Sequence, residues 1–228
     1  MKTIVCIKEL DTASDLNALV AAVDISDEVT AITMGPESSK ILAGEAVSRG
    51  ADKAIVITDN ALKDSDTLVT AKVLARTIEL IGDYDMIMLG NESNDSKTAQ
   101  VGPMIAEILS IEQITNVMAI EKNKAVKIMD GKKITVNYSL PVLMTVNKRI
   151  NQPDVYNMGG IFKEKDIKVV ALSDLGIDPA SAGANGSQTR ITGEYDAGFR
   201  ADGEWIEGST NKELAESLIS KLRDERAI

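Results

Sequence analysis

The sequence has 228 residues, of which 44% are hydrophobic, so it is long enough to bury a core of ordinary size. Its 35 acidic and 25 basic residues give a formal net charge of −10. This charge argues against nucleic acid as the main partner and against insertion at an anionic membrane surface, because both attract basic proteins.

The residue types that the chain lacks or holds once exclude several kinds of catalytic and metal site. The chain contains no histidine, which excludes Ser-His-Asp and Cys-His catalysis and a histidine-based zinc site. The one cysteine, Cys6, cannot form an internal disulfide or a metal cluster. We therefore expect no metal site and no catalytic residue, and a bound cofactor explains activity better than side-chain chemistry does.

No targeting or membrane segment is expected. The first residues contain an apolar run of only four residues before Lys8, too short for a secretory signal. No window approaches the roughly 18 apolar residues of a membrane span. These features predict a soluble, cytoplasmic protein.

The first half of the sequence alternates short apolar runs with longer segments of helical period. The apolar runs are typical of strands buried on both faces and cover Thr3–Ile7, Val29–Met34, Ala54–Thr58 and Met86–Leu89. Helices are expected at Asp15–Val23, Ser38–Arg49, Asp64–Ile81 and about Thr98–Leu109. This alternation predicts an α/β fold with a doubly wound, mainly parallel sheet of the Rossmann-like kind.

The pattern changes after Ile111. Three strand-like segments follow, at Asn116–Glu121, Ala125–Met129 and Ile134–Tyr138. Asp130-Gly131 is a strong hairpin-turn signal between the last two, so a small β-hairpin is expected as an addition to the sheet. Pro141–Val146 is a further apolar strand that could return to the main sheet.

The last third is less regular. Residues 147–168 show no sustained period, and Ala180–Gly193 is small and polar, typical of an extended surface arm. An amphipathic helix is expected at Lys212–Arg226, with its apolar face formed by Leu214, Leu218, Ile219 and Leu222. We therefore expect an α/β domain over 1–178, including a loop at 147–168. Residues 179–228 would form an arm and helix that pack on another chain.

The loop after the fourth predicted strand is the best candidate for a ligand site. Ligands of open parallel sheets bind beyond the carboxyl ends of strands, where helix N-termini offer unpaired N–H groups. The candidate cofactor-binding run is Gly90, Asn91, Glu92, Ser93, Asn94, Asp95, Ser96, Lys97, Thr98, Ala99, Gln100 and Val101. Its hydroxyls and Lys97 suit a phosphate. The alternative is a capped, solvated connection without a ligand, since neither a P-loop nor a GxGxxG motif is present.

Two further strand ends face the same edge. Cys6 ends the first strand, and Met34 precedes a Gly35-Pro36 turn after the second. We interpret the Cys6 side chain as a small buried hydrophobe, whereas its backbone could pair with an adenine edge.

These segments, in this order, resemble the electron transfer flavoprotein beta family. Matching pieces in the first half are Val5-Cys-Ile-Lys8, Val29–Pro36, Ala46–Asp52, Asp66-Thr-Leu68 and Thr98–Pro103. Later pieces are Asn151-Gln-Pro153, Gly160-Ile-Phe-Lys163, Asp174–Asp178 and the ending from Gly208. The resemblance covers nearly the whole chain, and the Thr98–Pro103 and Asn151–Lys163 segments are fairly specific together.

The resemblance implies a fold like that of the adenine-nucleotide alpha hydrolases and a heterodimer with an alpha subunit that carries most of a redox-active FAD. The beta subunit would hold a structural AMP, or the adenylate part of a second FAD in bifurcating relatives. Matched to this sequence, the nucleotide pocket uses Cys6, Met34 and Gly90–Val101.

Docking is implied by the same resemblance. The segment 151–168 corresponds to the recognition loop for flavin dehydrogenases such as an acyl-CoA dehydrogenase, with Met158 as its apolar anchor and Ile161 nearby. An ordinary buried methionine is the alternative for Met158. The electron donor, the acceptor and any oxidation of NADH are left open.

Three features depart from the family pattern. Glu9–Leu16 replaces a longer stretch, so its nucleotide contacts are lost or rebuilt around Thr12–Asp15, which makes Asp15 a candidate. Glu92 adds negative charge where a phosphate would lie, which opposes tight AMP binding. Glu164 and Asp166 dilute a normally lysine-rich docking loop.

Two other functions fit the predicted core. An adenine-nucleotide-binding regulatory module of the universal-stress-protein kind would bind ATP without an alpha subunit, but it leaves the segment 147–208 unexplained. An adenylating enzyme of the ATP-pyrophosphatase kind would need a Ser-Gly-Gly loop after the first strand, where this chain reads Lys8-Glu-Leu-Asp11.

Overall fold

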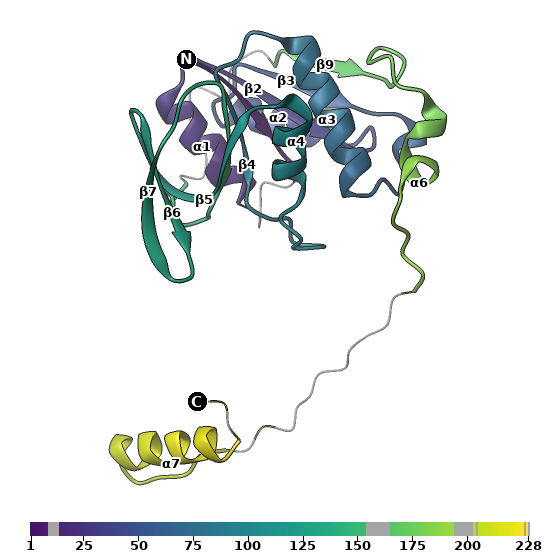
Figure 1. The fold of residues 1–228 in the computed structure, drawn as a ribbon. Coiled ribbons are helices and arrows are strands. Elements are labelled where there is room, and N and C mark those ends of the chain that lie inside the picture. The colour runs from purple at the N-terminus through teal and green to yellow at the C-terminus, as the bar shows by residue number, and fades with distance from the viewer. Residues whose placement is uncertain (9–13, 154–164, 194–202, 204, 226, 228) are drawn as a thin grey trace. The chain divides into compact units, whose positions relative to one another are not determined.

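The computed structural model describes residues 1–8, 14–153, 165–193, 203, 205–225 and 227. The chain divides into two compact units, Met1–Arg190 and Ile191–Ile228 (Figure 1). The described helices include none that is long and apolar enough to cross a membrane.

A nine-stranded sheet in the order β7-β6-β5-β8-β4-β1-β2-β3-β9 forms the centre of the first unit (Figure 1). The strands are β1 (Lys2–Cys6), β2 (Glu28–Met34), β3 (Lys53–Ile57), β4 (Met86–Gly90), β5 (Glu112–Glu121), β6 (Lys124–Met129), β7 (Lys132–Asn137), β8 (Val142–Val146) and β9 (Ile167–Val170). Along the part of the sheet with the order β5-β8-β4-β1-β2-β3-β9, each pair of neighbouring strands is parallel. Strand β6 pairs antiparallel with β5 and with β7. The predicted α/β fold with a mainly parallel sheet is confirmed.

Helices cover both faces of this sheet. Their bounds are α1 (Asp15–Ile25), α2 (Ser39–Ser48), α3 (Thr67–Ile81) and α4 (Val101–Leu109). Val5 and its neighbours pack with α1 and α2, whereas Ile4 and its neighbours pack with α3 and α4. Because successive strand residues point to opposite faces, strands covered on both sides must be apolar throughout, which explains the apolar runs in the sequence.

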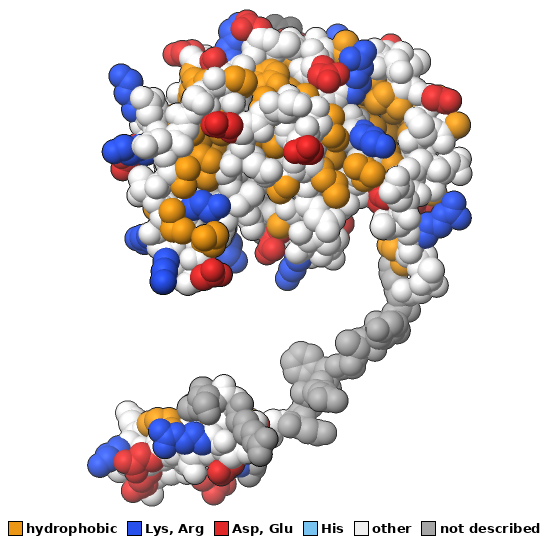
Figure 2. All heavy atoms as spheres, viewed as in Figure 1, with side chains coloured by type: hydrophobic (Ala, Val, Ile, Leu, Met, Phe, Trp, Pro, Cys, Tyr) orange, Lys and Arg blue, Asp and Glu red, His pale blue; other side chains and the backbone are white. Residues whose placement is uncertain are grey.

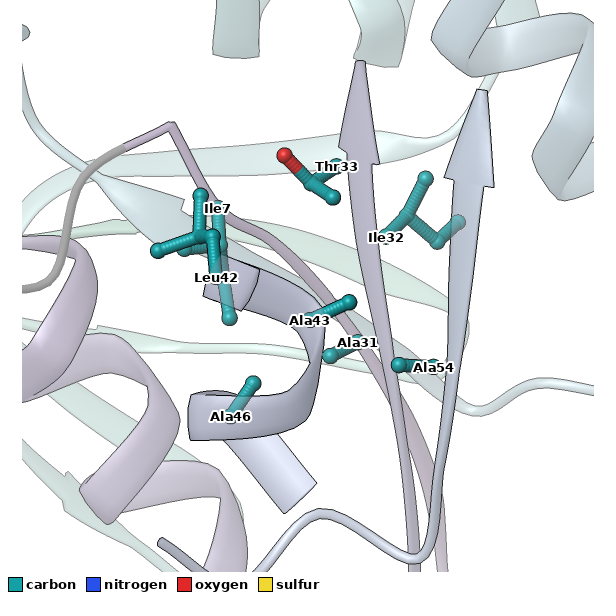
Figure 3. A pocket seen from close by; sticks show the side chains of 8 residues that line it. All are labelled: Ile7, Ala31, Ile32, Thr33, Leu42, Ala43, Ala46 and Ala54. Atoms are coloured by element: carbon teal, nitrogen blue, oxygen red, sulfur yellow. The ribbon is translucent and has the colours of Figure 1, made fainter. Parts of the chain in front are cut away.

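Alanines allow α2 to approach the sheet closely. Figure 3 shows Ala43 and Ala46 of α2 on the side of the helix near Ala31 of β2 and Ala54 of β3. The gap that they share with Ile7 and Leu42 is too small to hold a water molecule. This region is closed core and offers no room for a ligand.

The hairpin and the returning strand are also as predicted. Asp130 and Gly131 both have positive φ, 50° and 72°, as a two-residue type I′ turn requires. Strand β8 lies between β4 and β5, parallel to both, and so carries the chain back into the main sheet. The hairpin β6–β7 therefore extends one side of the sheet.

Some local features differ from the predictions. Strand β9 was not expected, because Ile167–Val170 is short and follows an irregular stretch. Helix α4 begins at Val101 instead of Thr98. The segment expected as an extended arm contains a short 3₁₀ turn, η2 (Pro179–Ser181), and the short helix α6 (Gly183–Gly186).

As far as Arg190, this last segment belongs to the first unit. Ala182 is 1% exposed, and a Cβ on Gly183 would lie 2.1 Å from the carbonyl oxygen of Ala61. The carboxylate of Asp66, which also caps α3, accepts hydrogen bonds from the backbone N–H groups of Gln188 and Thr189. Small polar residues here permit close packing, which a hydrophobic period does not reveal.

The second unit contains helix α7 (Asn211–Asp224), close to its predicted position. The Thr210 hydroxyl accepts a hydrogen bond from the Glu213 N–H at 3.2 Å, and the Glu213 carboxylate accepts one from the Ser209 N–H at 2.8 Å. None of the helix residues is buried, and Leu218 and Ile219 are 45% and 42% exposed. The described residues of the second unit therefore leave this apolar face unburied.

Candidate nucleotide-binding site

The carboxyl ends of four parallel strands meet at one edge of the sheet. Cys6 pairs with Ile32 on β2 and with Leu89 on β4, and Gly90 pairs with Val146 on β8. The loop after Gly90 therefore leaves the sheet beside the ends of β1 and β8 and leads to α4. The strand order thus brings the candidate residues Cys6, Met34 and Gly90–Val101 to one edge.

Asp15, at the start of α1, holds two of these strand ends together. Its carboxylate accepts a hydrogen bond from the Gly90 N–H at 2.9 Å and one from the Lys8 N–H at 2.7 Å. The neighbouring Ser14 hydroxyl accepts one from the Asn91 N–H at 2.9 Å. Asp15 is 7% exposed, so its carboxylate faces these backbone amides and not solvent. Through these hydrogen bonds Asp15 braces the start of the loop against the end of β1.

Gly90 is required by this brace. A Cβ at Gly90 would lie 2.4 Å from an Asp15 carboxylate oxygen and 2.5 Å from the Ser14 hydroxyl. No side chain fits at such distances without displacing the start of α1. The glycine at the loop entrance therefore serves the close approach of α1 to β4.

Asn91, the first residue after Gly90, is also held by a hydrogen bond from strand β8. The Thr145 hydroxyl of β8 donates to the Asn91 side-chain oxygen at 2.9 Å and accepts from the Asn116 N–H of β5 at 2.9 Å. Neither Thr145 nor Asn116 was expected at this site, because both lie within predicted strands. Nothing in the local pattern separates them from other strand residues.

Asp95 gathers three donors in the middle of the loop. It forms an ion pair with Lys8 and accepts hydrogen bonds from the Ser93 hydroxyl at 2.6 Å and the Ser96 N–H at 2.8 Å. The Lys8 ammonium and the Ser93 hydroxyl hold the pKa of the Asp95 carboxyl well below its usual range. An anion is thus already bound by groups that would suit a phosphate.

The end of the loop is open to solvent. Lys97, Thr98, Ala99 and Gln100 are exposed, and Lys97 and Ala99 have left-handed backbones with φ of 48° and 53°. Gln100 precedes α4, whose first turn at Val101 offers free N–H groups and partial positive charge. An ammonium, hydroxyls and a helix N-terminus therefore lie in one exposed stretch, with the acidic Glu92 exposed at its start and Asn94 exposed nearby.

The strand-end residues Cys6 and Met34 differ in burial. Cys6 is 6% exposed, and burial, with a smaller effect of the Asp15 carboxylate, raises the pKa of its thiol to about 12. The thiol is therefore protonated and inert at neutral pH, as a small buried hydrophobe should be. Met34 is half-buried and packs on the face of the sheet that α3 and α4 cover.

The predicted docking residues Met158 and Ile161 lie outside the described residues, as does Thr12 near the start of α1. The base of the docking segment is described and is fastened to α1. The Asn17 amide donates to the Asn151 side-chain oxygen at 2.8 Å, and the Asn151 amide donates to the Asn17 carbonyl at 3.0 Å. No cluster of three possible metal ligands is present among the described residues.

Comparison with known proteins agrees with this architecture. Residues 11–175 match the family model described as the electron transfer flavoprotein domain. The chain is 34% identical to the caffeyl-CoA reductase-Etf complex subunit CarD of Acetobacterium woodii, over 94% of this chain and 86% of the relative. It is 36% identical to the electron transfer flavoprotein subunit beta of Clostridium acetobutylicum, with the same coverage. It is also 30% identical to the acryloyl-CoA reductase electron transfer subunit gamma of Anaerotignum propionicum, again over 94% and 86%.

Proposed function

The chain belongs to the electron transfer flavoprotein family, as a relative of its beta subunits, and we propose that its own task is to hold an adenine nucleotide beside a flavin-carrying alpha subunit. Membership implies electron transfer, association with flavin and an alpha-subunit partner. The redox-active FAD would be held mostly by the alpha subunit. The complex would carry electrons without being an enzyme in its own right, and we place it in the cytoplasm.

One observation carries the nucleotide proposal. The loop Gly90–Val101 lies at the carboxyl edge of the sheet, is braced at its entrance by Asp15 and Ser14, and exposes Ser96, Lys97 and Thr98 before the start of α4. A phosphate there would accept from hydroxyls, an ammonium and helix N–H groups. We propose AMP, or the adenylate part of a second FAD, as the occupant.

Two apolar surfaces support packing against an alpha subunit. Helix α7 has an uncovered apolar face with Leu218 and Ile219. On the first unit, Figure 2 shows hydrophobic side chains among charged ones on the face that carries α3 and α4. Leu80 and Ile108 on these helices are 52% and 39% exposed. Burial of such side chains by a partner would stabilise the complex by roughly 1.5–3 kcal/mol for each fully buried side chain.

The redox partner is proposed from the relatives. Two of them are named as subunits that serve a caffeyl-CoA reductase and an acryloyl-CoA reductase. We propose that this chain docks on a flavin dehydrogenase that acts on an acyl-CoA, through the segment with Met158 and Ile161. Whether NADH feeds the complex depends on whether a second FAD replaces AMP.

The test is co-expression with the alpha subunit, followed by flavin and AMP assays of the denatured supernatant. One FAD and one AMP per heterodimer support an electron carrier with a structural AMP. Two FAD per heterodimer support a carrier in which a second FAD takes the place of AMP. A colourless chain that binds ATP without an alpha subunit would support the regulatory-module alternative. In the heterodimer, Ser96→Glu should lower nucleotide occupancy about tenfold or more, since the loss of a charge-assisted hydrogen bond costs roughly 1.5–3 kcal/mol. The matched control is Ser220→Glu on exposed α7.

A further inference from the structure

We infer that Thr145, a strand residue outside the loop, positions Asn91 so that the Asn91 side-chain amide donates to the bound nucleotide. This inference rests on the proposed nucleotide function and names two residues that set its affinity. Thr145 is 1% exposed and lies beneath the loop on β8, so it would act through Asn91 rather than touch the nucleotide.

The hydroxyl of Thr145 has a single proton, and the structure determines where that proton goes. The Thr145 oxygen accepts from the Asn116 N–H at 2.9 Å, and Asn91, also at 2.9 Å, is its other hydrogen-bond partner in the described part of the chain. The hydroxyl therefore donates to Asn91, because this buried proton would otherwise have no acceptor. The atom of Asn91 that accepts it must be the oxygen. The orientation of the Asn91 amide is thereby fixed by its surroundings.

The other end of the Asn91 amide is available for a ligand. Within the described part of the chain, the Asn91 side-chain nitrogen has no hydrogen-bond partner, and Asn91 is only half-buried. Its backbone N–H is occupied by the Ser14 hydroxyl. Two N–H donors are therefore held at the loop entrance, suited to a phosphate or ribose oxygen.

Asn116 is itself held rigidly. It has a left-handed backbone, with φ of 61°, at a bulge where the pairing of β5 with β8 shifts between Ile114 and Val117. Its side chain accepts from Asn147 at 2.7 Å and donates to the Ile128 carbonyl at 3.1 Å. Such bulges re-aim groups beside functional sites, and this one directs an N–H at Thr145.

Thr145 also contacts the far end of the loop. A Cβ on Gly102, in the first turn of α4, would lie 2.6 Å from the Thr145 methyl carbon. One side chain therefore supports both ends, with its hydroxyl at Asn91 and its methyl beside Gly102. Valine keeps a methyl in this place and removes the hydroxyl, whereas serine keeps the hydroxyl and removes the methyl.

The experiment measures AMP binding by calorimetry, on heterodimer from which bound nucleotide has been removed. Thr145→Val should weaken AMP binding about tenfold, and Thr145→Ser should weaken it much less. Asn91→Ala should cause a similar loss, and adding Thr145→Val to Asn91→Ala should cause no further loss, because both remove the same contact. Thr77→Val is the matched control, since Thr77 is also buried and, among the described residues, its hydroxyl bonds the Val73 carbonyl of α3 alone, at 2.9 Å.

The possible failures are distinguishable. Wild-type binding by Thr145→Val, or losses in the double variant that simply add, would overturn the positioning role alone. Hydrogen exchange should also speed up at Asn91 and its neighbours in Thr145→Val but not in Thr77→Val, and unchanged exchange there would overturn it too. Absence of AMP binding by the wild-type heterodimer would overturn the nucleotide function itself, and this inference with it.

Discussion

Lys8 and Asp95, 87 positions apart in the sequence, form an ion pair that joins the end of β1 to the loop after β4. Asp95 also accepts hydrogen bonds from Ser93 and Ser96 in the same loop. These donors are of the kinds that bind phosphate. A phosphate of the proposed nucleotide would compete with this carboxylate for them.

Asp95→Asn should therefore raise the affinity of the heterodimer for AMP by several-fold, because it removes a negative charge and frees the Lys8 ammonium. Calorimetry with AMP measures the change. Asp130→Asn, at the exposed hairpin turn, alters the net charge equally and should leave the affinity unchanged. A lower affinity in Asp95→Asn would mean that Asp95 shapes the loop for its ligand.

The pH dependence of this contact follows from the lowered pKa of Asp95. A depressed pKa gives stabilisation that is present above the unfolded value of about 3.9 and is lost only as pH falls through the lower folded value. Lowering the pH from 7 to 5 should therefore leave Asp95 charged. Such a change should not reproduce the effect of Asp95→Asn.

The Cys6 thiol should resist alkylation in the folded protein. Burial raises its pKa to about 12, so almost no thiolate exists at pH 8 and reagents cannot reach the sulfur. Iodoacetamide treatment of the heterodimer, followed by mass spectrometry of this chain, should show modification only after denaturant is added. Because the pKa rises above its ordinary value of 9.0 on folding, stability should fall as pH increases from about 9. Rapid labelling of the native complex would contradict the burial.

Met158 should dominate docking on the dehydrogenase while contributing little to folding. Burial of one methionine is worth roughly 1.5–3 kcal/mol, and one anchor of that size often dominates a small interface. Met158→Ala should slow electron transfer from the cognate dehydrogenase about tenfold, with an unchanged melting temperature and flavin spectrum. Met129→Ala, on a methionine that is 51% exposed at the hairpin, is the control and should transfer normally. A lower melting temperature with normal transfer would show that Met158 is a core residue.

Helix α7 should be needed for assembly. Leu218→Asp places a charge on its uncovered apolar face and should lower the yield of heterodimer on co-expression several-fold, because burial of that charge is costly. Ser220→Asp adds the same charge at an exposed polar position of the helix and should assemble normally.

Expressed alone, the chain should self-associate through these uncovered surfaces. Size-exclusion chromatography measures both results, and a stable monomer alone would argue against an obligate heterodimer.

The sequence by itself determined the alternation of strands and helices at the centre of the first unit. Apolar runs at Val29–Met34 and Met86–Leu89, separated by helical periods, are sufficient to predict parallel strands covered on both faces. Asp130-Gly131 predicted the hairpin because few other residues adopt two successive left-handed conformations. The loop after Gly90 followed as a candidate site, because the carboxyl edge of such a sheet is where loops and helix N-termini gather.

Only the tertiary structure decided which side chains support that loop. Thr145 and Asn116 lie within strands, and their roles depend on β8 lying between β4 and β5 and on a bulge in β5. Asp15 meets Gly90 only because β1 and β4 are neighbours. Periodicity reports which face of an element is buried, but hydrogen-bond partners across a sheet depend on strand order and register, which residues distant in the sequence establish together.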